Sequence, residues 1–394
     1  MKELIKIRGL TVKFDTYEGV VQALDNVDLD IKQRETFGLV GETGCGKTMT
    51  ALSLLRLIPH PGKIERGSIL FNVHDGEEPV DLLTLSEKKM RSMRGSYISM
   101  VFQEPSAALN PVYTIGDQIA EAILLHRQHA LAGEALETVN RLLAETAGPF
   151  SALLWPARSL ERRLFREMVQ HPDSLWPRIV GRIPLVRRLL WRLSDEANKA
   201  AVQMLREVEI PDPERVFRQY AHQLSGGMKQ RCIIAMALAC CLRFFIADEP
   251  TTALDVTIQA QILELLRRLK TDLEQSILYI THDLAVAAEI CDRIGVMYSG
   301  SLCEIAKAED LYSDPLHPYT KALMAAVPKP GQEPRPIAGV LPDPLDLPPG
   351  CRFHPRCDVA TRVCREQAPP MREVAPEHFV ACHLSKGGTG AGSS

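Results

Sequence analysis

The hydrophobic pattern of this chain predicts several buried strands and helices. "ETFGLV" at 35–40 and "RFFIADEP" at 243–250 are short apolar runs that predict strands. "MTALSLLRLI" at 49–58 and "MKQRCIIAMALAC" at 228–240 predict helices, and a longer helical region begins at "GDQIAEAILLHRQHA" and runs to Gln219. Near the N-terminus, Val12 and Phe14 share one face of a first predicted strand.

The composition is that of a globular protein. Of 394 residues, 45% are hydrophobic and 24% are charged, enough for one large domain with additions or for two domains. No run of 18 apolar residues occurs, and "MKELIKIRGLTVKF" lacks a long apolar core, so we expect a cytosolic chain that reaches a membrane only through a partner. A net charge of −3 argues against wholesale nucleic-acid binding. Ten cysteines in such a chain suggest metal or redox chemistry more than disulfides.

The segment "GETGCGKT" at 41–48 satisfies the pattern G-x-x-x-x-G-K-[ST] between a predicted strand and a predicted helix. Glycines let the backbone turn tightly, so that successive N–H groups point at an anion, and the positive end of the following helix strengthens the attraction. The lysine then reaches the β- and γ-phosphates of ATP, and the threonine hydroxyl is a ligand of Mg²⁺. The predicted ATP-binding residues of this P-loop are Gly41, Gly44, Cys45, Gly46, Lys47 and Thr48.

Two acidic residues end the predicted strand at 243–250. In a strand of the Walker-B type the first acid, here Asp248, holds Mg²⁺, and the second, here Glu249, polarises the attacking water. An acidic pair at a strand end often only caps a helix. The loop "PTTALD" follows here, and we therefore favour the catalytic interpretation.

A second anion-binding corner is predicted at "LSGGMKQR", 224–231, upstream of the acidic pair. Ser225, Gly226 and Gly227 open a predicted helix, so that a hydroxyl and backbone N–H groups are available to an anion. One chain needs only one phosphate cradle. The second suggests an ATP sandwiched between two subunits, each lending its Ser-Gly-Gly corner to the nucleotide on the other's P-loop.

With these motifs in this order, the sequence resembles an ABC-type ATPase. The resemblance implies an α/β fold with a RecA-like core, an antiparallel β subdomain and a helical subdomain. Gln103 in "ISMVFQEP" matches the Q-loop, which in the family contacts Mg²⁺ and the attacking water, and His282 in "LYITHDL" matches the switch histidine of the γ-phosphate. Asp255 in "ALD" matches the D-loop at the dimer seam. The family stacks adenine on an aromatic side chain before the P-loop, and both Phe14 and Tyr17 are candidates.

The ATPase domain is predicted at 1–312, with its helical subdomain at about 105–222. A compact member of the family would use fewer residues there, and we interpret about 131–195 as an insertion. It contains all three tryptophans and, over 155–193, nine arginines against three acids. A basic stretch of this kind could lie on anionic lipid headgroups or grip a transmembrane partner, and a helical hairpin with a solvated basic face is an equal alternative.

Residues 313–394 are predicted to form a C-terminal extension, separate from the domain that holds the P-loop. Its segment 328–350 is rich in proline and predicts an extended connector. Four clustered thiols in a reducing compartment favour an iron–sulfur cluster or zinc, although structural zinc usually shows tighter C-x2-C pairs. The predicted ligands, spaced C-x5-C-x6-C-x17-C, are Cys351, Cys357, Cys364 and Cys382. The other six cysteines lie in apolar or motif contexts and are predicted to be buried small residues.

"HPYTKAL", the proline connector and these cysteines narrow the resemblance to the oligopeptide/dipeptide transporter ATPases, in some of which four cysteines hold a 4Fe-4S cluster. The resemblance covers about 1–125 and 200–384. It implies an ATP- and Mg²⁺-dependent subunit of a peptide importer, peripheral on the cytoplasmic face of the cell membrane. The implied partners are a second ATPase subunit, two transmembrane permease subunits and an extracytoplasmic solute-binding protein, with no nucleic acid.

The alternative function is that of a soluble ABC ATPase in DNA repair or translation, because some of these also carry metal-binding cysteines. DNA-repair members insert long heptad coiled coils, and the insertion here is neither long nor heptad-like. Translation members usually carry two P-loops in one chain, and this sequence has one. The peptide importer is therefore favoured.

Overall fold

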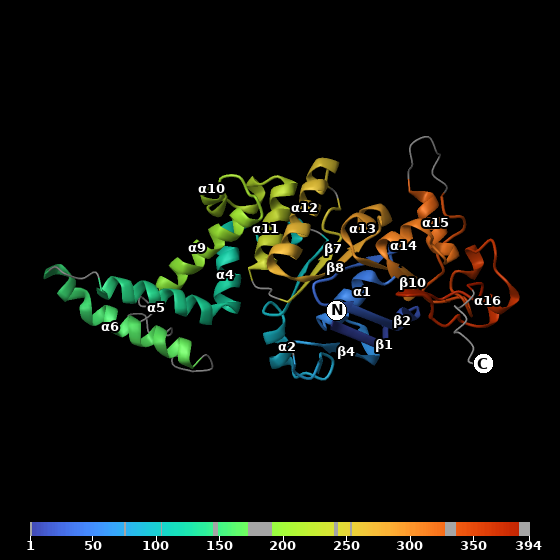
Figure 1. The fold of residues 1–394 in the computed structure, drawn as a ribbon, viewed down its shortest axis with the longest axis horizontal. Helices are drawn as coiled ribbons and strands as arrows, with labels where there is room; N and C mark the ends of the chain where they lie inside the picture. The colour runs from blue at the N-terminus through green and yellow to red at the C-terminus, as the bar shows by residue number, and fades with distance from the viewer. Residues whose placement is uncertain are drawn as a thin grey trace. The chain divides into compact units, whose positions relative to one another are not determined.

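The computed structural model describes residues 2–74, 76–103, 105–144, 149–171, 191–239, 243–252, 254–327 and 336–385 (Figure 1). The chain divides into two compact units, each described here by itself. The first unit combines Met1–Gln103 with Leu242–Ser394, and the second is Glu104–Cys241. The predicted helical subdomain at about 105–222 falls within the second unit.

An eight-stranded sheet forms the centre of the first unit, in the order β11-β12-β10-β9-β3-β8-β7-β6. Its strands β6, β7, β8, β3 and β9 are parallel, and all residues of β3, β7, β8 and β9 are buried. Continuous apolar runs such as "TFGLV" fit central parallel strands, which are covered on both faces. The strands are β3 (Thr36–Val40), β6 (Ile98–Val101), β7 (Phe244–Asp248), β8 (Ser276–Thr281), β9 (Arg293–Tyr298), β10 (Ser301–Lys307), β11 (Arg372–Ala375) and β12 (His378–Val380).

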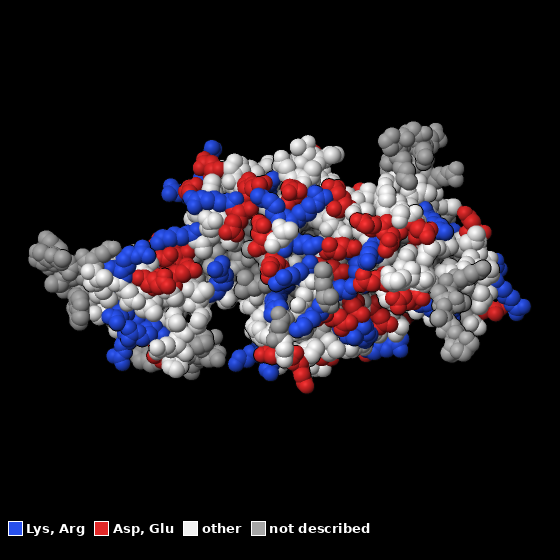
Figure 2. Space-filling model, in the orientation of Figure 1, with Lys and Arg blue, Asp and Glu red and all other residues white. Residues whose placement is uncertain are grey.

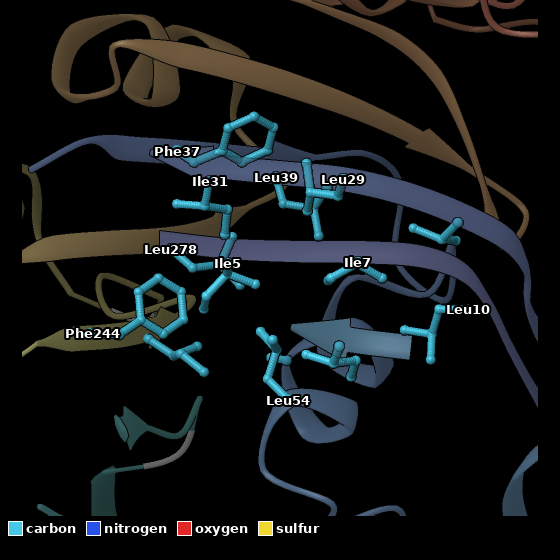
Figure 3. Close-up of a cluster of buried hydrophobic side chains, with 14 of the residues drawn as sticks. Ile5, Ile7, Leu10, Leu29, Ile31, Phe37, Leu39, Leu54, Phe244 and Leu278 are labelled. Atoms are coloured by element: carbon cyan, nitrogen blue, oxygen red, sulfur yellow. The ribbon is translucent and has the colours of Figure 1, made fainter. Parts of the chain in front are cut away.

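A smaller antiparallel sheet, in the order β2-β1-β4-β5, packs on the same core. It consists of β1 (Glu3–Thr16), β2 (Gly19–Lys32), β4 (Gly62–Phe71) and β5 (Val80–Asp81). Figure 3 shows side chains of β1 and β2 meeting those of β3, β7, β8 and the first helix, α1 (Lys47–Leu54). The predicted α/β fold with an antiparallel β subdomain is confirmed.

Seven helices are described in the first unit, and they connect or follow its strands. The P-loop helix α1 begins at Lys47 and ends at Leu54, two and four residues before the limits of the predicted helix at 49–58. The others are α2 (Glu87–Met93), α12 (Val256–Leu273), α13 (Leu284–Ile290), α14 (Ala308–Ser313), α15 (Pro318–Ala326) and α16 (Arg362–Glu366), with a short 3₁₀ turn η3 at His354–Arg356.

Helices and connecting loops make up the second unit, and its described residues contain no named strand. It contains α3 (Pro105–Ala108), α4 (Ile115–His126), α5 (Gln128–Ala144), α6 (Pro149–Gln170), α9 (Trp191–Glu207), α10 (Pro213–Phe217), the 3₁₀ turn η2 (Ala221–Gln223) and α11 (Gly226–Leu238). Helices α5 and α6 pack on each other, and α9 packs on α4 and α5. The predicted insertion thus consists of α5, α6 and the start of α9, where it is described.

Part of the predicted basic face of the insertion is buried. The Arg192 guanidinium lies 2.8 Å from the Glu161 carboxylate, and the two side chains are only 14% and 7% exposed. Arg158 donates to the carbonyl of Leu142. Trp176 and four of the counted arginines (178, 182, 187 and 188) lie outside the described residues. On the face drawn in Figure 2, basic and acidic side chains are interspersed among the described residues.

The C-terminal extension differs from the separate domain expected, because it continues the central sheet. Strand β12 pairs antiparallel with β10, and the Ala381 N–H donates to the Cys303 carbonyl at 2.8 Å. The fully buried Glu304 carboxylate of β10 bonds to His378 of β12 at 2.7 Å. Strands of three or four residues carry too little periodicity to be predicted. No helix in the described ranges is long and apolar enough to cross a membrane.

Candidate active site

The P-loop follows β3 directly and leads into α1. Gly44 and Gly46 have φ of 83° and 107°, conformations that residues with a side chain rarely adopt. A Cβ on Gly46 would lie 2.7 Å from Leu24 and 2.9 Å from the Ala23 carbonyl, and one on Gly41 only 2.2 Å from the Met297 carbonyl. At Gly44 nothing lies within 4 Å. The loop is therefore packed against β2 and β9 on one side and open at Gly44.

Lys47 is held inside the P-loop. Its Nζ donates to the carbonyls of Gly41 at 2.7 Å and Glu42 at 3.1 Å, and its side chain is buried. The Cys45 thiol lies 3.8 Å from the same ammonium. Burial raises the pKa of Cys45, although the charge of Lys47 opposes the shift. Cys45 is therefore a protonated, packed side chain at neutral pH.

Asp248 ends β7 with a carboxylate prepared for a cation. It is 2% exposed, and its Oδ1 has no hydrogen-bond partner. Burial raises its pKa to about 6 against the opposing hydrogen bond from Thr48. A buried carboxylate with an unpaired oxygen is costly unless a partner compensates it. An oxygen pair of carboxylate and hydroxyl is the donor set that Mg²⁺ prefers, and these two residues fit that ion.

Glu249 is the meeting point of three loops. Its backbone is left-handed at φ 47°, and its N–H donates to the Ile280 carbonyl of β8 at 2.9 Å. Its carboxylate, 11% exposed, accepts from Gln103 Nε2 at 3.0 Å and lies 3.4 Å from His282 Nδ1. The structure thus brings together Gln103, Glu249 and His282, which the sequence predicts as site residues.

Thr252 is a fourth member of this group that sequence reasoning missed. Its hydroxyl donates to Glu249 Oε2 at 2.9 Å. The signal for it was present in "PTTALD", where a hydroxyl three residues after the acid can bond back to it. The amide of Gln103 and the hydroxyl of Thr252 therefore both hold the same carboxylate oxygen, Oε2.

Two further predicted residues cap helices. Ser225 precedes α11 and accepts from the Met228 N–H at 3.4 Å, so the helix presents its N-terminal end at the Ser-Gly-Gly corner. Asp255 precedes α12 and accepts from the Ile258 N–H at 3.0 Å. The corner belongs to the second unit and Asp255 to the first. The helix-capping acid near β7 is Asp255, and neither Asp248 nor Glu249 caps the helix that follows.

The two aromatic candidates for adenine differ in exposure. Phe14 packs against the core, and a Cβ on Gly62 would lie 2.6 Å from its ring. Tyr17, in the turn between β1 and β2, is fully exposed. A ring committed to packing is not free to stack on a base, so the geometry favours Tyr17.

The four C-terminal cysteines lie in one small region but do not form a ligand set here. The Cys351 N–H donates to the Cys364 carbonyl at 2.8 Å, and Cys364 is buried. Burial raises the pKa of Cys351 to about 11 and also raises that of Cys357, and neighbouring thiols add to both shifts. Among the described residues no group of three or more His, Cys, Asp or Glu side chains could hold a metal ion.

The predicted Cys₄ site is thus not observed as such, for a physical reason. It is metal–sulfur bonding that supplies the energy to order four thiols around one centre. Of the other cysteines, Cys45, Cys232, Cys291 and Cys303 are buried, as expected. Cys240 and Cys241 lie outside the described residues.

A P-loop after β3, a buried acid at the end of β7, which β8 separates from β3 in the sheet, and a second acid held by a glutamine define a P-loop ATPase of the ABC type. Comparison with known proteins agrees. Residues 24–252 match the ABC transporter family, and residues 303–364 match the C-terminal region of oligopeptide/dipeptide transporters. The chain belongs to the ABC transporter family of ATPases.

Relatives align over nearly the whole chain. A probable peptide ABC transporter ATP-binding protein of Sinorhizobium fredii is 40% identical, over 97% of this chain and 95% of its own length. A dipeptide transport ATP-binding protein, DppD, of Bacillus subtilis is 39% identical over 98% and 95%. A solved dimeric bacterial ABC transporter cassette, MJ0796, shares the fold with a TM-score of 0.53 at 22% identity, covering 77% of this chain and 99% of that one.

Proposed function

We propose that this chain is the ATP-hydrolysing subunit of an importer for oligopeptides or dipeptides. The observation that carries the proposal is the match of residues 303–364 to the C-terminal region of oligopeptide/dipeptide transporters, joined to an ABC ATPase in one chain. Relatives named for peptide, dipeptide and oligopeptide transport, at 37–40% identity over nearly the same length, support it. A soluble ABC ATPase of DNA repair or translation is not favoured.

The geometry supports a division of labour within the site. The P-loop from Gly41 to Thr48 binds the phosphates, with Lys47 on the β- and γ-phosphates. Thr48, Asp248 and Gln103 hold Mg²⁺, which when bound neutralises charge on the phosphates. Glu249 orients and deprotonates the attacking water, because its carboxylate is already positioned by Gln103.

Completion of the site requires a second subunit in this proposal. The Ser225-Gly226-Gly227 corner presents a helix N-terminus to the nucleotide on the partner's P-loop, and Asp255 lies at the seam. His282 contacts the γ-phosphate, and Tyr17 stacks on adenine. The ATPase pair works beneath two permease subunits at the cytoplasmic face of the membrane, with a solute-binding protein outside.

Uptake of labelled peptides by cells tests the proposed function. Cells lacking this chain should lose uptake of a dipeptide or an oligopeptide, wild-type chain should restore it, and Glu249→Gln should not. Uptake of an unrelated solute is the matched control. Full peptide uptake without the chain would refute peptide import, while leaving its ATPase activity untouched.

We also propose that the four C-terminal thiols bind an iron–sulfur cluster of the 4Fe-4S type, with zinc as the alternative. Their clustering in one small region supports the proposal. Protein purified without oxygen should be brown and contain about four irons per chain, and Cys357→Ser should bleach it. A colourless preparation with about one zinc per chain would show that the thiols bind zinc and not a cluster. A metal-free preparation would refute both the cluster and the zinc assignment.

A further inference from the structure

The segment between two of the cysteines, 351–357, lies directly against the P-loop. The Arg356 guanidinium forms two parallel bonds to the Glu42 carboxylate, Nη1–Oε2 at 2.8 Å and Nη2–Oε1 at 3.2 Å. The Arg356 side chain is 4% exposed and that of Glu42 is 25% exposed. Bidentate arginine–carboxylate pairs that are largely shielded from water are strong and geometrically specific. This contact joins residues 314 positions apart.

Arg356 itself has no freedom to move away. Its Nε donates to the Ala338 carbonyl at 2.9 Å, and its Nη1 also donates to the Tyr298 hydroxyl at 3.3 Å. The guanidinium lies 5.8 Å from the Tyr298 ring and 6.0 Å from the Phe353 ring. A fixed guanidinium imposes its position on the carboxylate that it binds.

Glu42 is held through its backbone as well. Its N–H donates to the hydroxyl of Tyr319 at 3.0 Å, and that ring is fully buried against Tyr298 and Phe353. The Glu42 carbonyl accepts from Lys47 Nζ at 3.1 Å and from the Cys45 N–H at 3.2 Å. Displacement of Glu42 would therefore move a carbonyl that positions the phosphate-binding lysine.

We infer that Arg356 is a positioning residue for ATP binding: through Glu42 it fixes the P-loop in the conformation that places Lys47. The C-terminal extension is then a component of the nucleotide site. The inference needs only the ATPase, so it is independent of which solute is transported and of what the four thiols bind.

Nucleotide titration of the full-length chain tests the inference. Arg356→Gln should weaken binding of a fluorescent ATP analogue about tenfold, as expected for loss of one partner of a shielded charge pair. In steady-state assays KM should rise by a similar factor while kcat changes less than about threefold, because Glu249 is not displaced. Arg356→Lys should recover only part of the affinity, since an ammonium cannot bind the carboxylate in two places.

Arg352→Gln is the matched control. Arg352 lies in the same segment, is 12% exposed and pairs with Asp25 at 2.6 Å, and its other bond goes to the Ser299 carbonyl and not to Glu42. Glu42→Gln tests the pair from the other side with the extension intact. A variant that carries both Arg356→Gln and Glu42→Gln should bind ATP no more weakly than whichever single variant has the lower affinity. Unchanged ATP affinity in both Arg356→Gln and Glu42→Gln, or an equal loss in Arg352→Gln, would overturn the inference.

Discussion

Substitution of Glu249 by glutamine separates the chemistry of the site from its geometry. Glutamine has the same shape, and its amide oxygen can still accept from Gln103 and Thr252, so the two hydrogen bonds at 3.0 Å and 2.9 Å survive. Burial is the main cause of the raised pKa of Asp248 and does not change, and Thr48 and Asp248, two of the residues proposed to hold Mg²⁺, keep their oxygens. What is lost is the negative charge, and with it the capacity to accept a proton from water and the charged oxygen that lies 3.4 Å from His282 Nδ1.

Loss of a general base typically lowers turnover by about 10² to 10⁴, or about 3–5 kcal/mol in the barrier. ATP hydrolysis by the purified protein should fall by that factor, while binding of a fluorescent ATP analogue stays within about threefold. Thr252→Val removes one of two orienting bonds, worth about 1 kcal/mol, and should lower turnover only about fivefold. Turnover of Glu249→Gln within tenfold of wild type would refute the base assignment, and loss of ATP binding would refute the geometric argument.

The remaining predictions concern charge burial. Because the pKa of Asp248 is raised to about 6, its carboxyl gains a proton as the pH falls through 6. The affinity for Mn²⁺, measured by paramagnetic resonance, should therefore fall about tenfold from pH 7 to pH 5. Asp248→Asn should lack this pH dependence. Hydrogen bonds, chiefly from His378, lower the pKa of Glu304 although burial opposes them; its stabilisation is present above the unfolded pKa and is lost in acid. Glu304→Gln should lower the free energy of opening of the β10–β12 pairing by about 3 kcal/mol, which faster hydrogen exchange at the Ala381 amide would report. Glu161→Gln should leave Arg192 unpaired and lower the unfolding free energy by about 3 kcal/mol, with Glu161→Leu/Arg192→Met as the restored pair.

Local motifs account for the parts of the site that the sequence predicted. The P-loop, the acidic pair after β7 and the Ser-Gly-Gly corner each occupy fewer than ten consecutive residues, and their chemistry follows from that spacing. Gln103 and His282 lie 146 and 33 positions from Glu249, and only the resemblance to ABC ATPases linked them. The structure adds the distances that this resemblance could not supply.

Long-range charge pairing was beyond sequence reasoning. The number of arginines over 155–193 predicted a basic face. Arg192, however, pairs with Glu161, 31 positions earlier, and no sequence periodicity indicates such a pair. In the same way, nothing in "CRFHPRC" indicates that Arg356 binds Glu42 of the P-loop. Charge counts measure composition, whereas pairing depends on which helices and loops pack together.

The boundary predicted at 312 yields a final prediction, because the extension shares its core with the ATPase. Truncation after residue 312 would remove Tyr319 and Arg356 from Glu42 and leave the buried Glu304 without His378. An unpaired buried carboxylate costs several kcal/mol, a large part of the roughly 5–15 kcal/mol that stabilises a domain. We expect the truncated chain to be unstable in thermal unfolding, with Glu304→Leu recovering part of the loss but not ATP affinity. A truncated chain that binds ATP as tightly as the full one would show that the extension is only an appendage.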